Sequence, residues 1–120
     1  CRPSRIRAAR RARVTGDTMN DAVQRVFERM RREYLDELPA RLDELAAAAA
    51  ADDREAVKVR LHQLAGSGGS HGFPAISAVA REIERALAEE DDLLPRNRVM
   101  ENGLVRLHAA VADARESLSR

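Results

Sequence analysis

The chain has 120 residues and a net charge of +1, with 44% hydrophobic residues but only 2% aromatic ones. This length allows one domain, whose modest core must consist mainly of Leu, Val, Ile and Ala. No apolar run approaches the roughly 18 residues of a membrane span, and no secretory signal pattern is visible. The single cysteine, Cys1, excludes an internal disulfide and fits a reducing compartment. We therefore expect a cytoplasmic protein.

Positive charge is concentrated at the N-terminus. Residues 1–16 contain six arginines and no acidic residue, whereas the rest of the chain has 15 Lys and Arg against 20 Asp and Glu. An Arg-rich segment can contact nucleic acid or an anionic membrane surface, but a disordered tail or linker is the preferred interpretation. We expect residues 1–16 to form this basic tail and residues 17–120 to form the folded domain. The acidic charge of that domain argues against nucleic-acid binding.

The first amphipathic segment begins after residues 16–18, where Asp17 or Thr18 can cap free amides. Apolar residues then recur at steps of three and four, which indicates one stripe along a helix. The stripe consists of Val23, Phe27, Met30, Tyr34, Leu38, Leu42 and Leu45. Because Pro39 lies within it and lacks an amide donor, we expect a kink or a break between two helices there. The alanines at 46–51 extend the second part.

Three further helices follow. The spacing of apolar residues predicts them at about 53–69, from Phe73-Pro74 to about Leu87, and at about 96–117. We expect the glycines at 68, 69 and 72 to end the first of them. The buried stripes are Val57, Leu61, Leu64 and Ala65; Ile76, Val79, Ile83 and Leu87; and Leu104, Leu107, Val111, Ala114 and Leu118. Short connections favour antiparallel neighbours, so the sequence predicts an all-α, antiparallel up-and-down four-helix bundle with a short or kinked N-terminal helix extension.

Most kinds of catalytic site are excluded. His62, His71 and His108 are scattered, without the His or Cys spacing of a metal site. No Glu-x-x-His pair suggests a diiron bundle. The glycine-rich run at 66–70 lacks the Gly-Lys-Ser/Thr ending of a nucleotide phosphate loop. We expect neither a metal or cofactor of its own nor a self-contained enzyme.

His62 remains as a single reactive residue. We expect it at the edge of a buried helix face, partly packed and still reachable, with Gly66 and Gly69 one and two turns further along. A glycine inside a helix costs roughly 1 kcal/mol relative to Ala, so bare backbone beside the ring indicates that a large partner must approach it. A neutral imidazole can accept a phosphoryl group and pass it on. The alternative is an ordinary boundary histidine before helix-ending glycines, and spacing alone leaves both open.

The residues around His62 resemble the signature of histidine-containing phosphotransfer (HPt) domains, approximately His-x-Leu-Lys-Gly-Ser-Ala/Gly-x-x-x-Gly. From His62 to Gly72 the chain reads His-Gln-Leu-Ala-Gly-Ser-Gly-Gly-Ser-His-Gly. The segments at 73–76 and 80–84 are similar to the family's next helix, and the segment at 37–42 with the alanine run is similar to the preceding hairpin. The resemblance covers roughly residues 20–118.

This resemblance implies that His62 accepts a phosphoryl group from an aspartyl phosphate on a response-regulator receiver domain and passes it to another receiver, without kinase activity of its own. Gly66 would let the receiver approach, and Ser67 would belong to the surrounding polar surface. Glu84 would orient the ring and stabilise its charged form. Mg²⁺ is expected on the partner receiver. We expect a monomer, either standing alone or as a module of a hybrid sensor histidine kinase.

One position departs from the family pattern. Ala65 stands where the family usually has a lysine that neutralises the phosphate. Lys58, one turn before His62, can take that role, as can Arg60 or Arg85 at longer reach. Ala65 is also the main support for an alternative function, a non-phosphorylated helical adaptor that binds a receiver or another signalling partner. His71 is interpreted as a polar turn residue.

Overall fold

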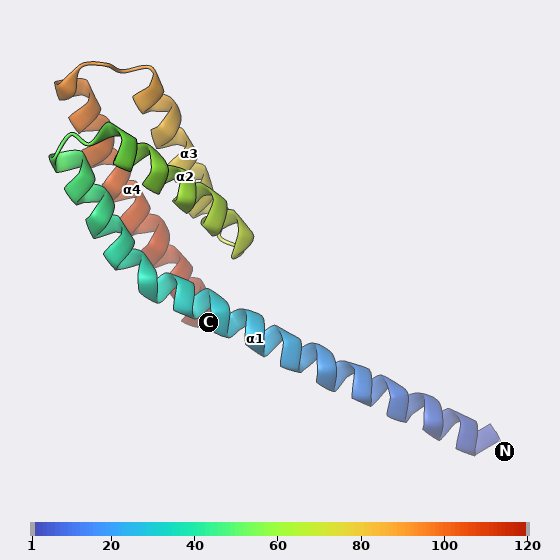
Figure 1. The fold of residues 1–120 in the computed structure, drawn as a ribbon. Helices are drawn as coiled ribbons and strands as arrows, with labels where there is room; N and C mark the ends of the chain where they lie inside the picture. The colour runs from blue at the N-terminus through green and yellow to red at the C-terminus, as the bar shows by residue number, and fades with distance from the viewer. Residues whose placement is uncertain (1, 120) are drawn as a thin grey trace. The chain divides into compact units, whose positions relative to one another are not determined.

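The computed structural model describes residues 2–119, and for residues 2–19 it describes only the backbone. All regular structure in this range is helical (Figure 1). The helices are α1 (Arg2–Ala50), α2 (Arg54–Ser70), α3 (Pro74–Ala88) and α4 (Leu93–Ser119). The chain divides into two compact units, Cys1–Met30 and Arg31–Arg120. The second unit contains the four-helix bundle.

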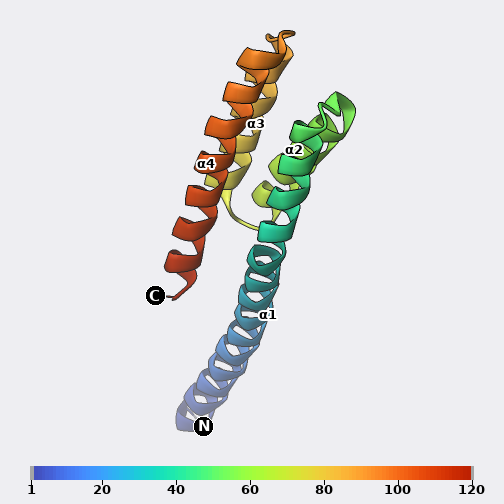
Figure 2. The ribbon, with the colours of Figure 1, turned by 90° about the vertical axis from the view of Figure 1, so that its left-hand side faces the viewer.

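Successive helices of the bundle run in opposite directions, with α3 beside both α2 and α4 (Figures 1 and 2). One apolar core joins residues of all four helices, and Leu, Ile, Val and Ala make up most of it, as the composition predicts. Fully buried members are Leu38, Leu42, Leu45, Leu61, Ile76, Ala80 and Leu107. The predicted all-α bundle is confirmed. None of the described helices is both long and apolar enough to span a bilayer.

The sequence predicts a kink or a break at Pro39. The break is wrong, because α1 continues through this residue, and the kink stays a prediction. Pro39 is exposed, while Leu38 and Leu42 beside it are buried in the core. Core packing on either side of the lost hydrogen bond keeps the helix continuous. The backbone of residues 2–16 also belongs to α1; the side chains of this predicted tail lie outside the described residues, and its boundary at residue 17 stays a prediction.

The apolar stripe of α1 is buried only in its second half. Tyr34, Leu38, Leu42 and Leu45 belong to the core, but Val23, Phe27 and Met30 are 46–60% exposed. The predicted amphipathic stripe is therefore buried at its last four members and exposed at its first three. Periodicity identifies an amphipathic face, but it does not say whether another segment covers that face.

The remaining helix ends lie close to their predicted positions. The Asp53 carboxylate accepts a hydrogen bond from the Ala56 amide at 3.2 Å and caps α2. Gly72, with a φ of +82°, follows α2 in the left-handed conformation that a glycine tolerates. However, Gly68 and Gly69 lie inside α2 and do not end it. Helix α4 begins at Leu93, before the predicted start, because Pro95 is tolerated in a first turn.

A stack of rings fixes the C-terminal end of α2 against α1. The Tyr34 ring lies 4.3 Å from the His71 ring, nearly parallel to it, and 5.9 Å from the Phe73 ring. The Tyr34 hydroxyl shares a 2.7 Å hydrogen bond with the Ser67 hydroxyl, and His71 Nδ1 donates to the Ser67 carbonyl at 2.8 Å. His71 thus lies in the predicted turn, with its ring stacked and half-buried. Burial raises the pKa of the Tyr34 hydroxyl, and its bond to Ser67 offsets part of this effect.

The titration of Tyr34 tests this packing directly, because the chain has one tyrosine and no tryptophan. We expect its ultraviolet absorbance to titrate above pH 10.0 in the folded protein and at the ordinary tyrosine value in urea. When a group has a higher pKa in the folded state than in the unfolded state, its contribution to the free energy of unfolding is fully present below the unfolded-state pKa. That contribution is lost as the pH rises through the folded-state pKa. The free energy of unfolding should therefore fall above about pH 10. Tyr34→Phe should lack this loss, and equal midpoints in the two states would contradict the buried placement.

Candidate functional site

His62 lies on the outer edge of α2, directly beside the buried Leu61. Its side chain is 85% exposed, whereas Leu61 and Leu64 are almost completely buried. The predicted edge position is confirmed. The expectation that the ring is partly packed is wrong, because neighbours leave it largely open to solvent. The ring is therefore available to a second macromolecule.

Glu84 of α3 is the described residue paired with the His62 ring. Its Oε2 lies 4.0 Å from His62 Nδ1, and the Glu84 side chain is 27% exposed. This distance suits an ion pair but is too long for a direct hydrogen bond. The structure thus brings together these two predicted site residues from neighbouring helices. The carboxylate lies on the Nδ1 side of the ring, so Nε2 is the ring nitrogen farther from Glu84.

The glycines after His62 have different environments. A Cβ at Gly66 would have no neighbour within 4 Å, so bare backbone and open space lie one turn from the ring. A Cβ at Gly68 would lie 3.2 Å from the Ser77 backbone nitrogen and 3.3 Å from Ile76 Cγ2. At Gly69 the nearest atom, the Ser77 hydroxyl oxygen, would be in ordinary contact at 3.7 Å. The backbone at Gly66 therefore faces open space, whereas Gly68 allows α3 to pack closely.

Two contributors to this arrangement were missed in the sequence. Gly68 lies seven residues after Leu61 and four after Leu64, so helical spacing places it in the same buried stripe. This spacing was the sequence signal for its buried position. Ser77 is buried, and its hydroxyl donates to the Ala65 carbonyl at 2.7 Å. No spacing rule predicts this bond, because it joins two helices whose register the sequence does not give.

A groove between α1 and α2 passes one side of the site. His62 lines it with Gln63 and Leu64, and its polar lining includes Arg41, Glu44, Arg60 and Ser67. The guanidinium of Arg60 is paired with the Glu44 carboxylate, and that of Arg41 is paired with Glu37 at 3.1 Å. Ser67, predicted as part of the polar surface, is half-buried and bonded to Tyr34. The arginines of this groove therefore already have carboxylate partners.

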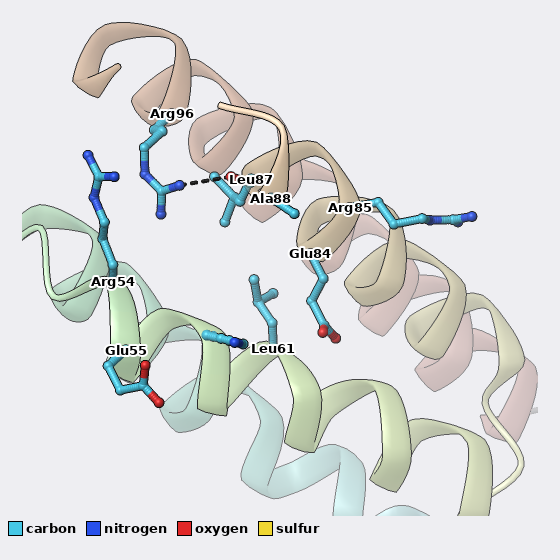
Figure 3. A pocket seen from close by; sticks show the side chains of 9 residues that line it. Arg54, Glu55, Leu61, Glu84, Arg85, Leu87, Ala88 and Arg96 are labelled. Atoms are coloured by element: carbon cyan, nitrogen blue, oxygen red, sulfur yellow. Dashed lines mark hydrogen bonds between the residues drawn. The ribbon is translucent and has the colours of Figure 1, made fainter. Parts of the chain in front are cut away.

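A second groove lies between α2, α3 and α4 (Figure 3). Leu61, Leu87 and Ala88 form its apolar lining, with Arg54 and Arg96 at one end and Glu84 toward the other. Both arginines donate hydrogen bonds to backbone carbonyls, either at the end of α3 or in the connection between α3 and α4. Arg54 Nη2 donates to the Asp91 carbonyl at 2.7 Å, and Arg96 Nη1 donates to the Leu87 and Glu90 carbonyls at 2.9 Å.

The candidate phosphate-neutralising residues are distributed unequally around this second groove. Lys58 lines the groove together with Glu84, the residue that faces His62. Arg85 also lines this groove (Figure 3). Arg60 lies on the α1 side and pairs with Glu44. Of the three candidates, Lys58 and Arg85 therefore share a groove with the partner of His62.

Comparisons with known proteins agree with this architecture. The family model described as the Hpt domain matches residues 29–117. The crystal structure of the HPT domain from the Hpt sensor hybrid histidine kinase of Shewanella superposes with a TM-score of 0.61 and 23% sequence identity. That alignment covers 77% of this chain and 79% of the other. At this identity the structural likeness concerns the fold. Comparison with curated proteins gives no match. In the described part of the chain, no three His, Cys, Asp or Glu residues gather as metal ligands.

Substitution of the two glycines by alanine separates access from packing. Gly66→Ala should raise the free energy of unfolding by up to about 1 kcal/mol, because alanine favours the helix and its methyl group meets open space. Gly68→Ala should be less stable than Gly66→Ala, because its methyl group would press on the α3 backbone. Urea unfolding of the two variants measures the difference. Equal stabilities, or a less stable Gly66→Ala, would contradict the assignment.

Proposed function

This chain belongs to the Hpt domain family, whose members carry phosphoryl groups in phosphorelay signalling, and we propose that His62 is its phosphoryl acceptor. One observation supports this assignment above the others. The ring is 85% exposed, faces a carboxylate at Nδ1, and lies one turn from a glycine with open space around it. These features suit a nucleophile that must enter the active site of another protein.

The proposed reaction is a reversible exchange between a histidine and an aspartate. The lone pair of His62 Nε2 attacks the phosphorus of an aspartyl phosphate on a receiver domain. The phosphorus–oxygen bond to the aspartate breaks, and the aspartate leaves as a carboxylate. Phosphoryl-His62 keeps its proton on Nδ1, where the Glu84 carboxylate offsets the positive charge of the ring. The carboxylate of a second receiver aspartate then attacks the phosphorus and releases neutral His62.

We assign the remaining requirements of phosphoryl transfer to the partner. In-line positioning and charge neutralisation account for most of the catalysis in such reactions. Gly66 lets the partner's backbone approach the ring closely. We expect the receiver to hold the Mg²⁺ that neutralises the transferring group. In this account the chain itself supplies an oriented nucleophile and no kinase activity.

We also infer the setting in which the chain acts. The structural relative is a domain of a sensor hybrid histidine kinase, and we extend this setting to the present chain. Its phosphoryl donor would be the receiver of such a kinase, and its acceptor would be the receiver of a response regulator. Lys58, beside Glu84 in the second groove, would add positive charge on the α2 side.

Treatment with phosphoramidate, a small donor for histidine, tests the proposal. We expect intact mass spectrometry to find one acid-labile phosphoryl group on the wild type and none on His62→Gln. His108→Gln is the matched control, because His108 is an exposed histidine on α4 and its replacement should leave the label unchanged.

Retention of the label in His62→Gln would refute the assignment. Failure of the folded wild type to accept a phosphoryl group from both phosphoramidate and a phosphorylated receiver would favour an adaptor that binds without phosphorylation. Circular dichroism of each variant verifies that the helices are intact.

A further inference from the structure

The contacts between α2 and α3 define which residues of the two helices lie opposite each other. At one end, the Ser77 hydroxyl bonds the Ala65 carbonyl, and the same oxygen would lie 3.7 Å from a Cβ at Gly69. At the other end, Glu84 lies 4.0 Å from His62. Since the helices are antiparallel, the segment of α2 from Gly69 back to His62 lies alongside the segment of α3 from Ser77 to Glu84.

Arg81 lies midway between these two contacts. It follows Ser77 by four residues and precedes Glu84 by three, and these spacings place all three on the same edge of α3. On α2 the equivalent position is Ala65, four residues from Gly69 and three from His62. Arg81 therefore lies opposite Ala65, one turn before Glu84 on the edge of α3 that faces the His62 ring.

The guanidinium of Arg81 is also available to bind a ligand. It is exposed, and within the described part of the chain no hydrogen bond or ion pair engages it. By contrast, Arg60 pairs with Glu44, Arg41 with Glu37, and Arg54 and Arg96 bond backbone carbonyls. Lys58 and Arg85 share a groove with two carboxylates, Glu55 and Glu84.

The position three residues after His62 contributes no charge. Ala65 is 4% exposed, and its carbonyl is bonded to Ser77. A phosphoryl group on Nε2 would bring roughly two negative charges to a surface whose nearest ionic partner is the Glu84 carboxylate. A cation on the edge of α3 that faces the ring would offset this charge. The long stem of an arginine can carry its guanidinium past the buried Ala65.

We propose that Arg81 is the phosphoryl-binding residue of this chain and takes the place of the cation missing at Ala65. This inference rests on the proposed role of His62. Guanidinium geometry allows two N–H groups to donate to two phosphoryl oxygens.

The titration of the phosphoryl group tests the proposal without a partner protein. The full chain is phosphorylated with phosphoramidate, and the ³¹P chemical shift is followed against pH. A nearby positive charge favours the dianion and lowers the pKa of the phosphoryl group. In Arg81→Gln we expect this pKa to rise by about 0.5, the size of an exposed ion pair. The difference from wild type should shrink in high salt.

Two variants control for charge and for structure. Arg81→Lys should restore most of the wild-type titration, because it keeps the charge. Arg98→Gln removes an exposed arginine of α4 that lines neither groove beside His62, and it should titrate like wild type.

If the phosphoryl group of Arg81→Gln titrates with the wild-type pKa, the proposal is wrong. This holds whether or not Lys58→Gln raises the pKa of the phosphoryl group. A shift in Arg98→Gln as large as that in Arg81→Gln would also overturn it, because the effect would then reflect overall charge. Absence of any phosphoryl group on His62 in the wild type would instead refute the proposed function.

Discussion

The close approach of α2 and α3 determines the rest of the site. A Cβ at Gly68 would lie only 3.2 Å from the Ser77 backbone nitrogen, and the Ser77 hydroxyl bonds the Ala65 carbonyl in the interior. Together these contacts set the distance and the register of the two helices. Seven residues beyond Ser77, that register brings Glu84 to His62. A different register would leave the exposed ring without its carboxylate.

The site combines a rigid support with an open surface. The core beneath His62 is tightly packed, and the stack of Tyr34, His71 and Phe73 holds the far end of α2. Above this support, the ring and Gly66 face solvent. A carrier needs both properties, because the nucleophile must be oriented before the partner arrives and must still fit into the partner's active site.

Local patterns in the sequence predicted most of the fold but only part of the site. Helical spacing gave the positions of α2, α3 and α4, and the motif placed His62 and Gly66 on an exposed edge. It did not separate the roles of Gly66 and Gly68, because both fit a glycine-rich helix end and only the packing of α3 distinguishes them. The continuity of α1 through Pro39 depends on core contacts, and the positions of Ser77 and Arg81 depend on the register between helices. Such long-range relations leave no periodic signal in one sequence.

The bond between phosphorus and nitrogen tests the central claim most directly. Selective ¹⁵N labelling of the histidine rings, followed by NMR of the phosphorylated chain, identifies the nitrogen that carries the phosphoryl group. The account predicts phosphorus coupling at Nε2 of His62, with Nδ1 protonated on the side of Glu84. Coupling at Nδ1 of His62, or at a nitrogen of His71 or His108, would contradict it.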